Sequence, residues 1–383
     1  MEIRPKRDQK AFIITPFFKK IPNKTFIGYN SHVNFREHHR QKILSALAED
    51  RGPLDLFLNS YFRSHKAIGS KDRRFLSDTI YDDVRWKGLI DYLGQRPENF
   101  IEASQDATIP PHIRVSFPLE LFNLLSQNEP LCRILNERAP TVIRINPLKT
   151  SRESLLKAWE GKYQCAPTEH SPWGIVFKER VHLLSLPEFQ EGLFEIQDEA
   201  SQLAAAMLEA KPKDHVLDYC AGSGGKTLAF APAMQGQGQI YLHDIRLSAL
   251  QKARLRLRRA GIQNVQFQIS PKLKGKMDWV FVDAPCSGTG TLRRNPDLKW
   301  KFNLDMLHRL VEEQRQIFAE ALTYLSPHGS IIYATCSLLT EENEKQIAFF
   351  EEKHQLKSQK IFRSIPESGG MDGFFASVLV RNR

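Results

Sequence analysis

Short apolar runs alternate with helical patterns over residues 191–383, and this alternation limits the fold more than any other feature. Five runs have strand character: Val216–Leu217, Gln239–Leu242, Val265–Ile269, Trp279–Val282 and Ile331–Ala334. Helical patterns such as Ser248–Ala260 and Leu304–Leu325 separate them. The alternation predicts an α/β fold with a mainly parallel sheet. Thr340 is expected to cap the last helix, and Gly373–Val380 to close the sheet as an edge hairpin.

Cysteine-containing segments follow two of these predicted strands. Asp283–Gly290 (DAPCSGTG) comes after the fourth run, and Thr335–Ser337 (TCS) comes after the fifth. In a doubly wound sheet, residues just past the strand ends face the ligand crevice. Cys286 and Cys336 are therefore expected to meet over one substrate, although about fifty residues of sequence separate them.

A glycine-rich turn, Asp218–Thr227 (DYCAGSGGKT), follows the first strand-like run. Its three glycines allow the backbone to approach a ligand, and the helix N-terminus beyond it offers free amide groups. The turn does not match a P-loop, because the first glycine of that motif is missing. Asp244 lies 26 residues after Asp218, where a carboxylate can accept hydrogen bonds from ribose hydroxyls. NAD and S-adenosylmethionine both carry such a ribose, so the turn predicts a nucleotide-like cofactor.

The two thiols and a neighbouring carboxyl group suit methyl transfer to a pyrimidine ring. Carbon 5 of a pyrimidine is too electron-poor to accept a methyl cation directly, but addition of a thiolate to carbon 6 makes carbon 5 nucleophilic. The reaction needs a nucleophile, a carboxylic acid that binds the ring nitrogen, and a base. Cys336, Asp283 and Cys286 supply these types of group. Cys132 and Cys165 are interpreted instead as small buried hydrophobic residues.

The formal net charge of +10 favours a polyanionic partner, nucleic acid before membrane. The five cysteines include no Cys-x-x-Cys pair, which argues against a disulfide framework or a zinc site and for a reducing cytoplasm. No run approaches the roughly 18 apolar residues of a membrane span. We therefore expect a cytoplasmic protein without metal or membrane contact, and a monomer.

Three segments precede the α/β region. Residues 1–33 form a basic arm broken by prolines, residues 34–130 have only helical patterns, and residues 135–190 mix strand and helix in a small α/β insert. Ser70 and Ser151 are expected to cap helices in the second and third segments.

Two groups of basic residues are candidates for contacts with phosphates. Arg293 and Arg294 lie beside the Cys286 loop. The helical segment carries five more cations, which are either phosphate contacts or an ordinary solvated face: Arg63, Lys66, Lys71, Arg73 and Arg74.

Several long stretches carry a family resemblance. They are the glycine turn, Asp283–Trp300 (DAPCSGTGTLRRNPDLKW), Tyr333–Ser337 (YATCS), Phe194–Gln202 (FEIQDEASQ) and Asp372–Phe375 (DGFF). Together they resemble the RsmB/Nop family of RNA 5-methylcytosine methyltransferases, over residues from about 135 to 383. The resemblance implies a Rossmann-like S-adenosylmethionine methyltransferase domain at 191–383, preceded by a small α/β subdomain at 135–190. The helical segment, 34–130, resembles the all-helical, RNA-binding NusB-like domain of RsmB-type members.

By this resemblance, Cys336 is the nucleophile that attacks the base, and Cys286 assists product release as a base or by aiding thiolate departure. The implied cofactor contacts are Cys220, Ala221, Gly222, Ser223, Gly224, Gly225, Lys226, Asp244 and Asp283. Lys226 is also expected to assist catalysis from the boundary between cofactor and base. The chain departs from the family pattern at Ser223, usually proline, and at residues 269–272 (ISPK), which hold no carboxylate after the third strand.

The resemblance implies S-adenosylmethionine-dependent methylation of carbon 5 of a cytosine in RNA. Ribosomal RNA is the favoured substrate because of the NusB-like domain, and transfer RNA is the second candidate. A non-catalytic RNA-binding assembly factor that retains the fold is a different interpretation, favoured only by the missing carboxylate. DNA cytosine methylation is a further alternative, against which the second thiol, Cys336, and the RNA-type N-terminal domain argue.

Overall fold

The structure is a computed structural model that describes residues 31–50 and 52–382. The predicted basic arm lies outside the described residues except for residues 31–33, which begin the first helix. The chain divides into two compact units, Met1–Ser116 and Phe117–Arg383.

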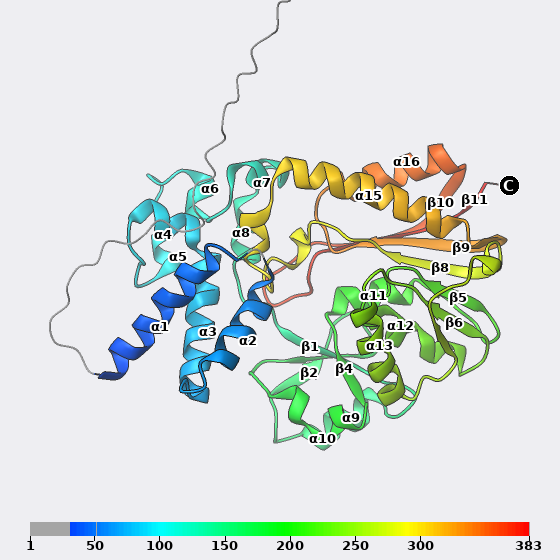
Figure 1. The fold of residues 1–383 in the computed structure, drawn as a ribbon, viewed down its shortest axis with the longest axis horizontal. Helices are drawn as coiled ribbons and strands as arrows, with labels where there is room; N and C mark the ends of the chain where they lie inside the picture. Colours follow the sequence, from blue (N-terminus) through cyan, green and yellow to red (C-terminus); the bar gives the residue numbers. More distant parts are fainter. Residues whose placement is uncertain (1–30, 51, 383) are drawn as a thin grey trace, which may run out of the picture. The chain divides into compact units, whose positions relative to one another are not determined.

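In its described residues, unit 1 consists of helices joined by turns and loops (Figure 1). Its helices are α1 (Ser31–Leu47), α2 (Leu54–Ser64), α3 (Ser70–Arg85), α4 (Lys87–Leu93), α5 (Phe100–Ala103) and α6 (Pro111–Arg114). In α3, Leu76, Ile80 and Val84 are spaced by one turn and are fully buried, so they form the inner face of the helix. The predicted cap at Ser70 is wrong: Ser70 is already helical, and Gly69 precedes it with extended backbone and no side chain to cap with.

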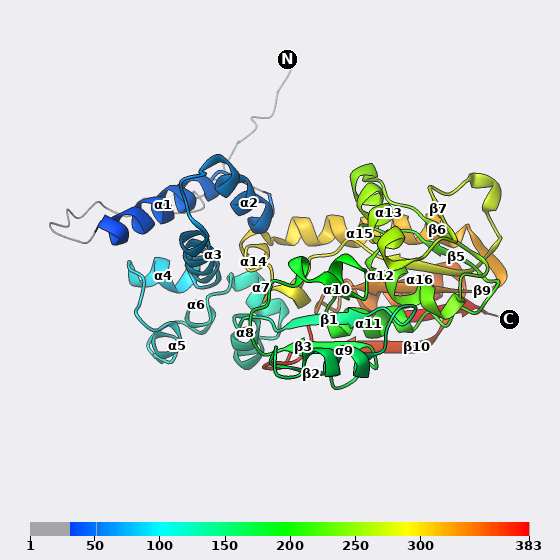
Figure 2. The same cartoon turned by 90° about the horizontal axis from the view of Figure 1, so that it is seen from below.

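Unit 2 begins with two short helices, α7 (Leu119–Leu124) and α8 (Glu129–Leu135). A small antiparallel sheet with strand order β2-β3-β1-β4 follows (Figure 2). Its elements are β1 (Thr141–Ile145), α9 (Arg152–Trp159), β2 (Cys165–Pro167), β3 (Gly174–Phe177), α10 (Pro187–Gln190) and β4 (Phe194–Ile196). Ser151 caps α9 as predicted, because its side chain accepts a hydrogen bond from the Ser154 amide.

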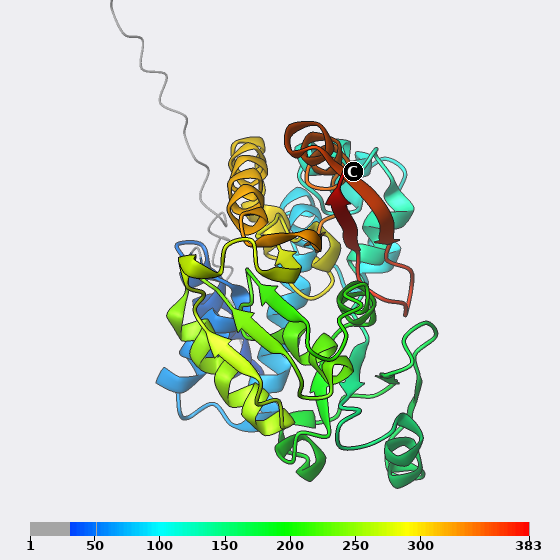
Figure 3. The same ribbon diagram turned by 90° about the vertical axis from the view of Figure 1, so that its right-hand side faces the viewer.

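The large sheet has seven strands in the order β10-β11-β9-β8-β5-β6-β7 (Figure 3). They are β5 (His215–Asp218), β6 (Gln239–Leu242), β7 (Val265–Phe267), β8 (Met277–Asp283), β9 (Leu325–Thr335), β10 (Leu356–Ser364) and β11 (Phe374–Arg381). Strands β5 to β9 pair in parallel, which confirms the predicted α/β fold with a mainly parallel sheet. The segment predicted to close the sheet as an edge hairpin, Gly373–Val380, does form one strand of such a hairpin, but β10 is the outermost strand: β11 lies between β9 and β10 and is antiparallel to both.

Helices cover both faces of this sheet. They are α11 (Glu199–Ala206), α12 (Gly225–Phe230), α13 (Leu247–Ala260), α15 (Leu304–Leu322) and α16 (Glu344–His354), and the short helix α14 (Leu298–Lys301) precedes α15. Figure 1 shows α11, α12 and α13 on one face and α15 and α16 on the other, and each group buries apolar residues against the sheet. The sheet therefore has a hydrophobic core on each side and leaves its strand ends for polar residues.

Two predicted boundaries around β9 differ from the structure. Helix α15 ends at Leu322, because Leu325 already belongs to β9. Helix α16 begins after Asn343, and Thr340 contributes its backbone oxygen to the amides of Asn343 and Lys345 instead of a side-chain cap.

Within the described residues, no helix combines the length and apolar character that a membrane span requires. The same residues hold no group of three or more metal-ligating side chains.

Candidate active site

The two strand-end cysteines lie together. Strands β8 and β9 are parallel neighbours, with Asp283 opposite Ala334, so the segments that follow them leave the sheet at one edge. The Sγ atoms of Cys286 and Cys336 are 3.4 Å apart, and both residues are half-buried. This arrangement makes the two sulfur atoms a hydrogen-bonded pair at the carboxyl edge of the sheet.

A glycine brings the two segments into register. The Gly290 amide donates to the Cys336 backbone oxygen at 2.9 Å, and the Gly373 amide donates to the Gly290 oxygen at 3.0 Å. A Cβ atom at position 290 would lie 2.1 Å from the Gly373 oxygen, which the backbone could not accommodate without moving. Only glycine allows this close approach of three segments.

The Cys286 thiol has a raised pKa. This pKa is raised well above the ordinary value, first by the hydrogen bond with Cys336, then by burial and the charges of Cys336 and Glu342. At neutral pH Cys286 is therefore a thiol, in contact with the other sulfur atom.

Lys226 and Asp283 form an ion pair close to the cofactor turn. Lys226 extends from the first turn of α12, and its Nζ atom lies 2.7 Å from Asp283 Oδ2 and 4.7 Å from the centre of the Phe374 ring. The other oxygen, Oδ1, makes no hydrogen bond to any residue that the structure describes. The pair thus leaves one carboxyl oxygen for a ligand.

The glycine turn adopts backbone conformations that require glycine. Gly222 and Gly224 have φ angles of +51° and +79°, and a Cβ atom at Gly224 would lie 3.2 Å from Ala253 in α13. Ser223, between them, is held from outside the turn: the Arg256 guanidinium donates to its hydroxyl at 2.7 Å and to its backbone oxygen at 2.9 Å. A charged hydrogen bond thus fixes Ser223 within the turn.

Asp244 reaches back to this turn from the end of β6. Its Oδ2 atom accepts from the Gly222 amide at 2.8 Å, and Arg246 donates to both carboxylate oxygens. Burial opposes its ionisation, but the hydrogen bonds from Arg246 and Gly222 outweigh it and lower the pKa of Asp244. A buried, ionised carboxylate next to the turn suits the hydroxyls of a ribose.

Asp218 is a residue that the sequence interpretation missed. Its Oδ2 atom accepts from the Thr227 hydroxyl at 2.6 Å, whereas Oδ1 is buried without a hydrogen-bond partner. Burial is the main reason why the pKa of Asp218 is raised to about 7. Its place as the last residue of β5, directly before the turn, is the sequence signal that could have identified it. An unpaired buried oxygen, the ionised Asp244 and the open glycine backbone together fit the polar groups of S-adenosylmethionine.

The remaining cysteines differ from the pair. Burial and the charges of Asp218, Asp283 and Asp244 raise the pKa of Cys220, which keeps this thiol neutral beside the turn. Cys132 is fully buried in α8 with its pKa raised to about 12 by burial, as expected for a packing residue.

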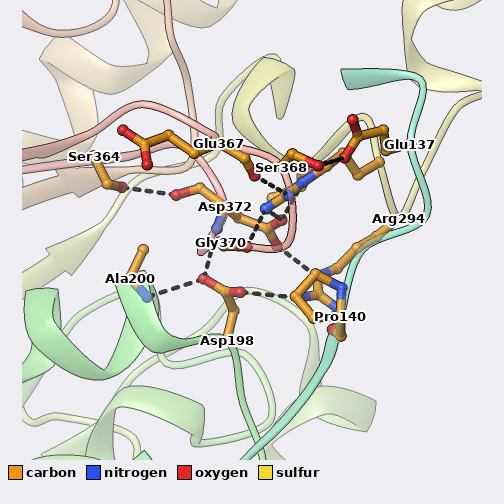
Figure 4. A network of polar contacts seen from close by, with 12 residues as sticks. Glu137, Pro140, Asp198, Ala200, Arg294, Ser364, Glu367, Ser368, Gly370 and Asp372 are labelled. Atoms are coloured by element: carbon orange, nitrogen blue, oxygen red, sulfur yellow. Dashed lines mark hydrogen bonds and ion pairs between the residues drawn. The ribbon is translucent and has the colours of Figure 1, made fainter. Parts of the chain in front are cut away.

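The prediction that Arg293 and Arg294 bind substrate phosphates is wrong, because both pair with carboxylates of the protein (Figure 4). Arg293 is fully buried, binds Asp372 Oδ1 at 2.9 Å and donates to the backbone oxygens of Glu367 and Gly370. Arg294 lies between Asp198 and Asp372 and donates to both. These arginines fix the loop before β11 to the segment that carries Cys286.

A family profile described as "16S rRNA methyltransferase RsmB/F" matches residues 205–380. A protein of Synechocystis sp. named "Probable ribosomal RNA small subunit methyltransferase B" is 33% identical over 63% of this chain and 57% of its own length. "Ribosomal RNA small subunit methyltransferase B" of Pseudomonas putida is 30% identical over 71% of this chain and 68% of its own length. The chain thus spans less than two thirds of the Synechocystis relative and slightly more than two thirds of the Pseudomonas one.

A solved structure has the same fold. NSun6 from Pyrococcus horikoshii, crystallised with the S-adenosylmethionine analogue SFG, covers 75% of this chain and 98% of its own with a TM-score of 0.61 and 21% identity. This likeness confirms the Rossmann-like methyltransferase fold, and the family profile confirms the resemblance seen in the motifs. The cofactor is S-adenosyl-L-methionine. The chain belongs to the RsmB/F family of S-adenosylmethionine-dependent methyltransferases.

Proposed function

We propose that the protein transfers a methyl group from S-adenosylmethionine to carbon 5 of a cytosine in RNA, with Cys336 as the nucleophile. The observation that carries the proposal is the pair of Sγ atoms 3.4 Å apart at the sheet edge, in a chain whose Lys226–Asp283 ion pair adjoins the cofactor turn. A non-catalytic factor would have no need of two hydrogen-bonded thiols at this edge.

The two sulfur atoms have different roles in the proposed methyl transfer. Cys336, as the thiolate, adds to carbon 6 of the cytosine, and the ring electrons move toward carbon 5 and the ring nitrogen. S-adenosylmethionine, when bound, supplies the electrophilic methyl group. Removal of the carbon 5 proton then restores the double bond and expels the Cys336 thiolate, which leaves free enzyme and methylated base.

The proton on Cys286 supports this division. We assign the S–H donor of the sulfur–sulfur contact to Cys286, because the hydrogen bond with Cys336 is the first cause of its raised pKa. A hydrogen bond to a thiolate stabilises the thiolate, so the pair favours Cys336 as the attacking atom. Cys286 can pass its proton to the departing Cys336 sulfur, and its own sulfur, then deprotonated, can accept the carbon 5 proton. Both cysteines end as thiols and the methylated base is free.

Asp283 is proposed to bind the ring nitrogen of the cytosine, and Lys226 to hold Asp283 in place. Lys226 occupies Oδ2 of the carboxyl group, and Oδ1 is available to a ligand. With a proton passed to it from the Lys226 ammonium group, the Asp283 carboxyl group can donate a hydrogen bond to the ring nitrogen and stabilise the negative charge that develops there when the thiolate adds.

The cofactor would contact the residues of the glycine turn from Cys220 to Lys226, together with Asp244, Asp283 and Asp218. Asp244 is proposed to bind the ribose hydroxyls of the cofactor. These hydroxyls would replace part of the hydrogen bonding from Arg246 to the Asp244 carboxylate. No acidic residue follows β7: Ser270 instead caps a short turn by accepting from the Lys272 amide.

Transfer of tritium-labelled methyl groups from S-adenosylmethionine tests the proposal directly. RNA that contains unmethylated small-subunit ribosomal sequence should gain label, and bisulfite sequencing should locate it at a cytosine. DNA of the same sequence should gain none. Cofactor binding without label transfer to ribosomal or transfer RNA would contradict the enzymatic proposal and favour an RNA-binding assembly factor.

Small-subunit ribosomal RNA is the substrate we propose, and transfer RNA is the second candidate. The names of the curated relatives support the first choice. We propose further that residues 34–130 are an RNA-binding domain of NusB type and that the protein acts as a monomer in the cytoplasm. All five cysteines are free thiols, which is consistent with a reducing compartment.

Four exposed cations of α2, α3 and the turn between them are the proposed phosphate contacts: Arg63, Lys66, Lys71 and Arg74. None of the four forms an ion pair with a residue that the structure describes. Arg73, the fifth predicted contact, instead donates to the Ile68 backbone oxygen and lies over the Phe62 ring. It therefore serves the fold of unit 1.

Replacement of these four cations by alanine should weaken RNA binding and reduce its salt dependence. Each lost phosphate contact lowers the slope of log K against log salt by about 0.7 to 0.9. Filter binding at several salt concentrations measures the slope. Alanine at four exposed lysines of the other unit, Lys178, Lys211, Lys353 and Lys357, is the matched control and should change the slope less. Equal changes in both variants would argue against a specific surface.

A further inference from the structure

Glu342 lies between the two segments that carry the thiols. It precedes α16 and is fully buried, with 0% of its surface exposed. Its Oε2 atom accepts from the hydroxyls of Ser287 and Ser337, each at 2.5 Å. These serines follow Cys286 and Cys336 directly in the sequence, so one carboxylate binds both segments one residue away from each sulfur atom.

The other carboxylate oxygen strengthens the link to the Cys286 segment. Oε1 accepts from the Ser287 amide at 2.8 Å and from the Gln314 side-chain amide at 3.0 Å. Gln314 also donates to the Pro285 backbone oxygen, so α15 and Glu342 together enclose this segment. The Ser287 amide and the Gln314 nitrogen can only donate, and an ionised carboxylate accepts all four hydrogen bonds.

No lysine or arginine among the described residues pairs with Glu342. A buried carboxylate without a cation is costly unless hydrogen bonds replace its hydration, which is the role of the four donors. Its charge is therefore not neutralised by a partner and acts on neighbouring titratable groups. A residue that served packing alone would not need such a charge.

We propose that Glu342 is a positioning residue that makes the two thiols unequal: it fixes their spacing, and its negative charge keeps the proton on Cys286. This inference rests on the proposed function, in which Cys336 is the atom that attacks. Without this charge the proton could reside on either sulfur atom. With this charge, the proton stays on Cys286 and Cys336 is the sulfur atom that attacks.

The groups that act on Cys286 are few in the described part of the chain. The Cys336 sulfur and the Glu342 charge raise the pKa of Cys286 together with burial, and the Gly288 amide lowers it. Tyr333 also faces this thiol, but burial first, and then Glu342 and Cys286, raise the pKa of its phenol well above the ordinary value. The phenol is therefore neutral and donates to the Glu342 backbone oxygen at 2.8 Å. Among these groups of the described chain, Glu342 supplies the carboxylate that raises the pKa of Cys286.

Three variants separate charge from spacing. Glu342→Gln removes the charge but retains an oxygen for the Ser287 amide and Gln314, and its NH2 group can donate to the two hydroxyls after they rotate. Glu342→Asp keeps the charge and shortens the side chain by one methylene group. Glu341→Gln, the control, removes a charge one residue away that pairs with Lys345.

Alkylation of Cys286 by iodoacetamide tests the charge in a Cys336→Ser background. Mass spectrometry would give the rate from about pH 6 to 10, without RNA or cofactor. Glu342→Gln should shift the profile to lower pH and accelerate alkylation at pH 8 roughly threefold to tenfold, because each unit of pKa is tenfold in thiolate fraction. Glu342→Asp and Glu341→Gln should keep the profile of the background protein.

An unchanged profile in a folded Glu342→Gln variant would overturn the proposal, because a purely structural role would leave the profile in place. If that variant does not fold, Glu342→Asp still decides: a profile shifted by this amount despite the retained charge would also overturn it. With both cysteines present, Glu342→Asp should lose methyl transfer through altered spacing. The alkylation result stands even if RNA is not the substrate, so the two proposals can fail separately.

Discussion

Replacement of Cys336 by alanine should abolish methyl transfer, whereas replacement of Cys286 by alanine should leave RNA covalently attached to the enzyme. The two Sγ atoms are 3.4 Å apart, and Cys286 carries the proton. Without Cys336 no adduct forms, and the rate should fall by roughly a thousandfold or more, as for other lost nucleophiles. Without Cys286 addition still occurs, but the adduct is not resolved.

Denaturing gel electrophoresis with labelled RNA measures the adduct, and methyl transfer from tritium-labelled cofactor measures turnover. Cys165→Ala, a half-buried thiol of the small sheet, is the control and should retain both activities. An adduct in the Cys336 variant and none in the Cys286 variant would reverse the assignment. The double variant should form no adduct, which would show that the retained RNA is bound through Cys336.

Replacement of Arg293 by leucine should lower the free energy of unfolding by about 3 to 5 kcal/mol, the usual loss when one partner of a buried ion pair is removed. Arg293 is fully buried, and its loss removes the hydrogen bonds that it donates to Asp372 Oδ1 and to the backbone oxygens of Glu367 and Gly370. Chemical denaturation followed by circular dichroism measures the change.

The matched control is Arg363→Leu. Arg363 pairs with Glu344 on the surface, where both side chains are 41% exposed, so its loss should cost about 1 kcal/mol or less. Equal losses in the two variants would show that the network of Figure 4 contributes no special stability. Methyl transfer should also fall in the Arg293 variant, because the network holds the loop before β11 against the Cys286 segment.

The sequence alone predicts the strands whose side chains are buried on both faces of the sheet. Apolar runs predict β5 to β9, because parallel strands are buried on both faces and their composition shows it. The same reasoning missed β10 (LKSQKIFRS), whose polar residues are typical of an edge strand and hide it from a search for apolar runs. Because β10 was missed, the sequence identified only β11 of the hairpin at this edge.

Long-range polar contacts were the least predictable part of the site. Arg293 and Arg294 have the composition of a phosphate site, and only the fold brings Asp372 and Asp198 to them. Glu342 was likewise overlooked, because nothing local in its sequence reveals four donors from three other segments. The roles of the two cysteines and the NusB type of residues 34–130 stay predictions.

The position of β11 has a consequence for synthesis of the protein. Strand β11 fills the gap between β9 and β10, and Gly373, just before it, donates to Gly290 beside the thiol pair. A nascent chain that has emerged only to residue 372 therefore lacks both ladders of β11 and the hydrogen bond from Gly373 to Gly290. The backbone contact that holds Gly290 beside the sulfur atoms can form only after synthesis has passed Gly373, well after both cysteines have been added to the chain.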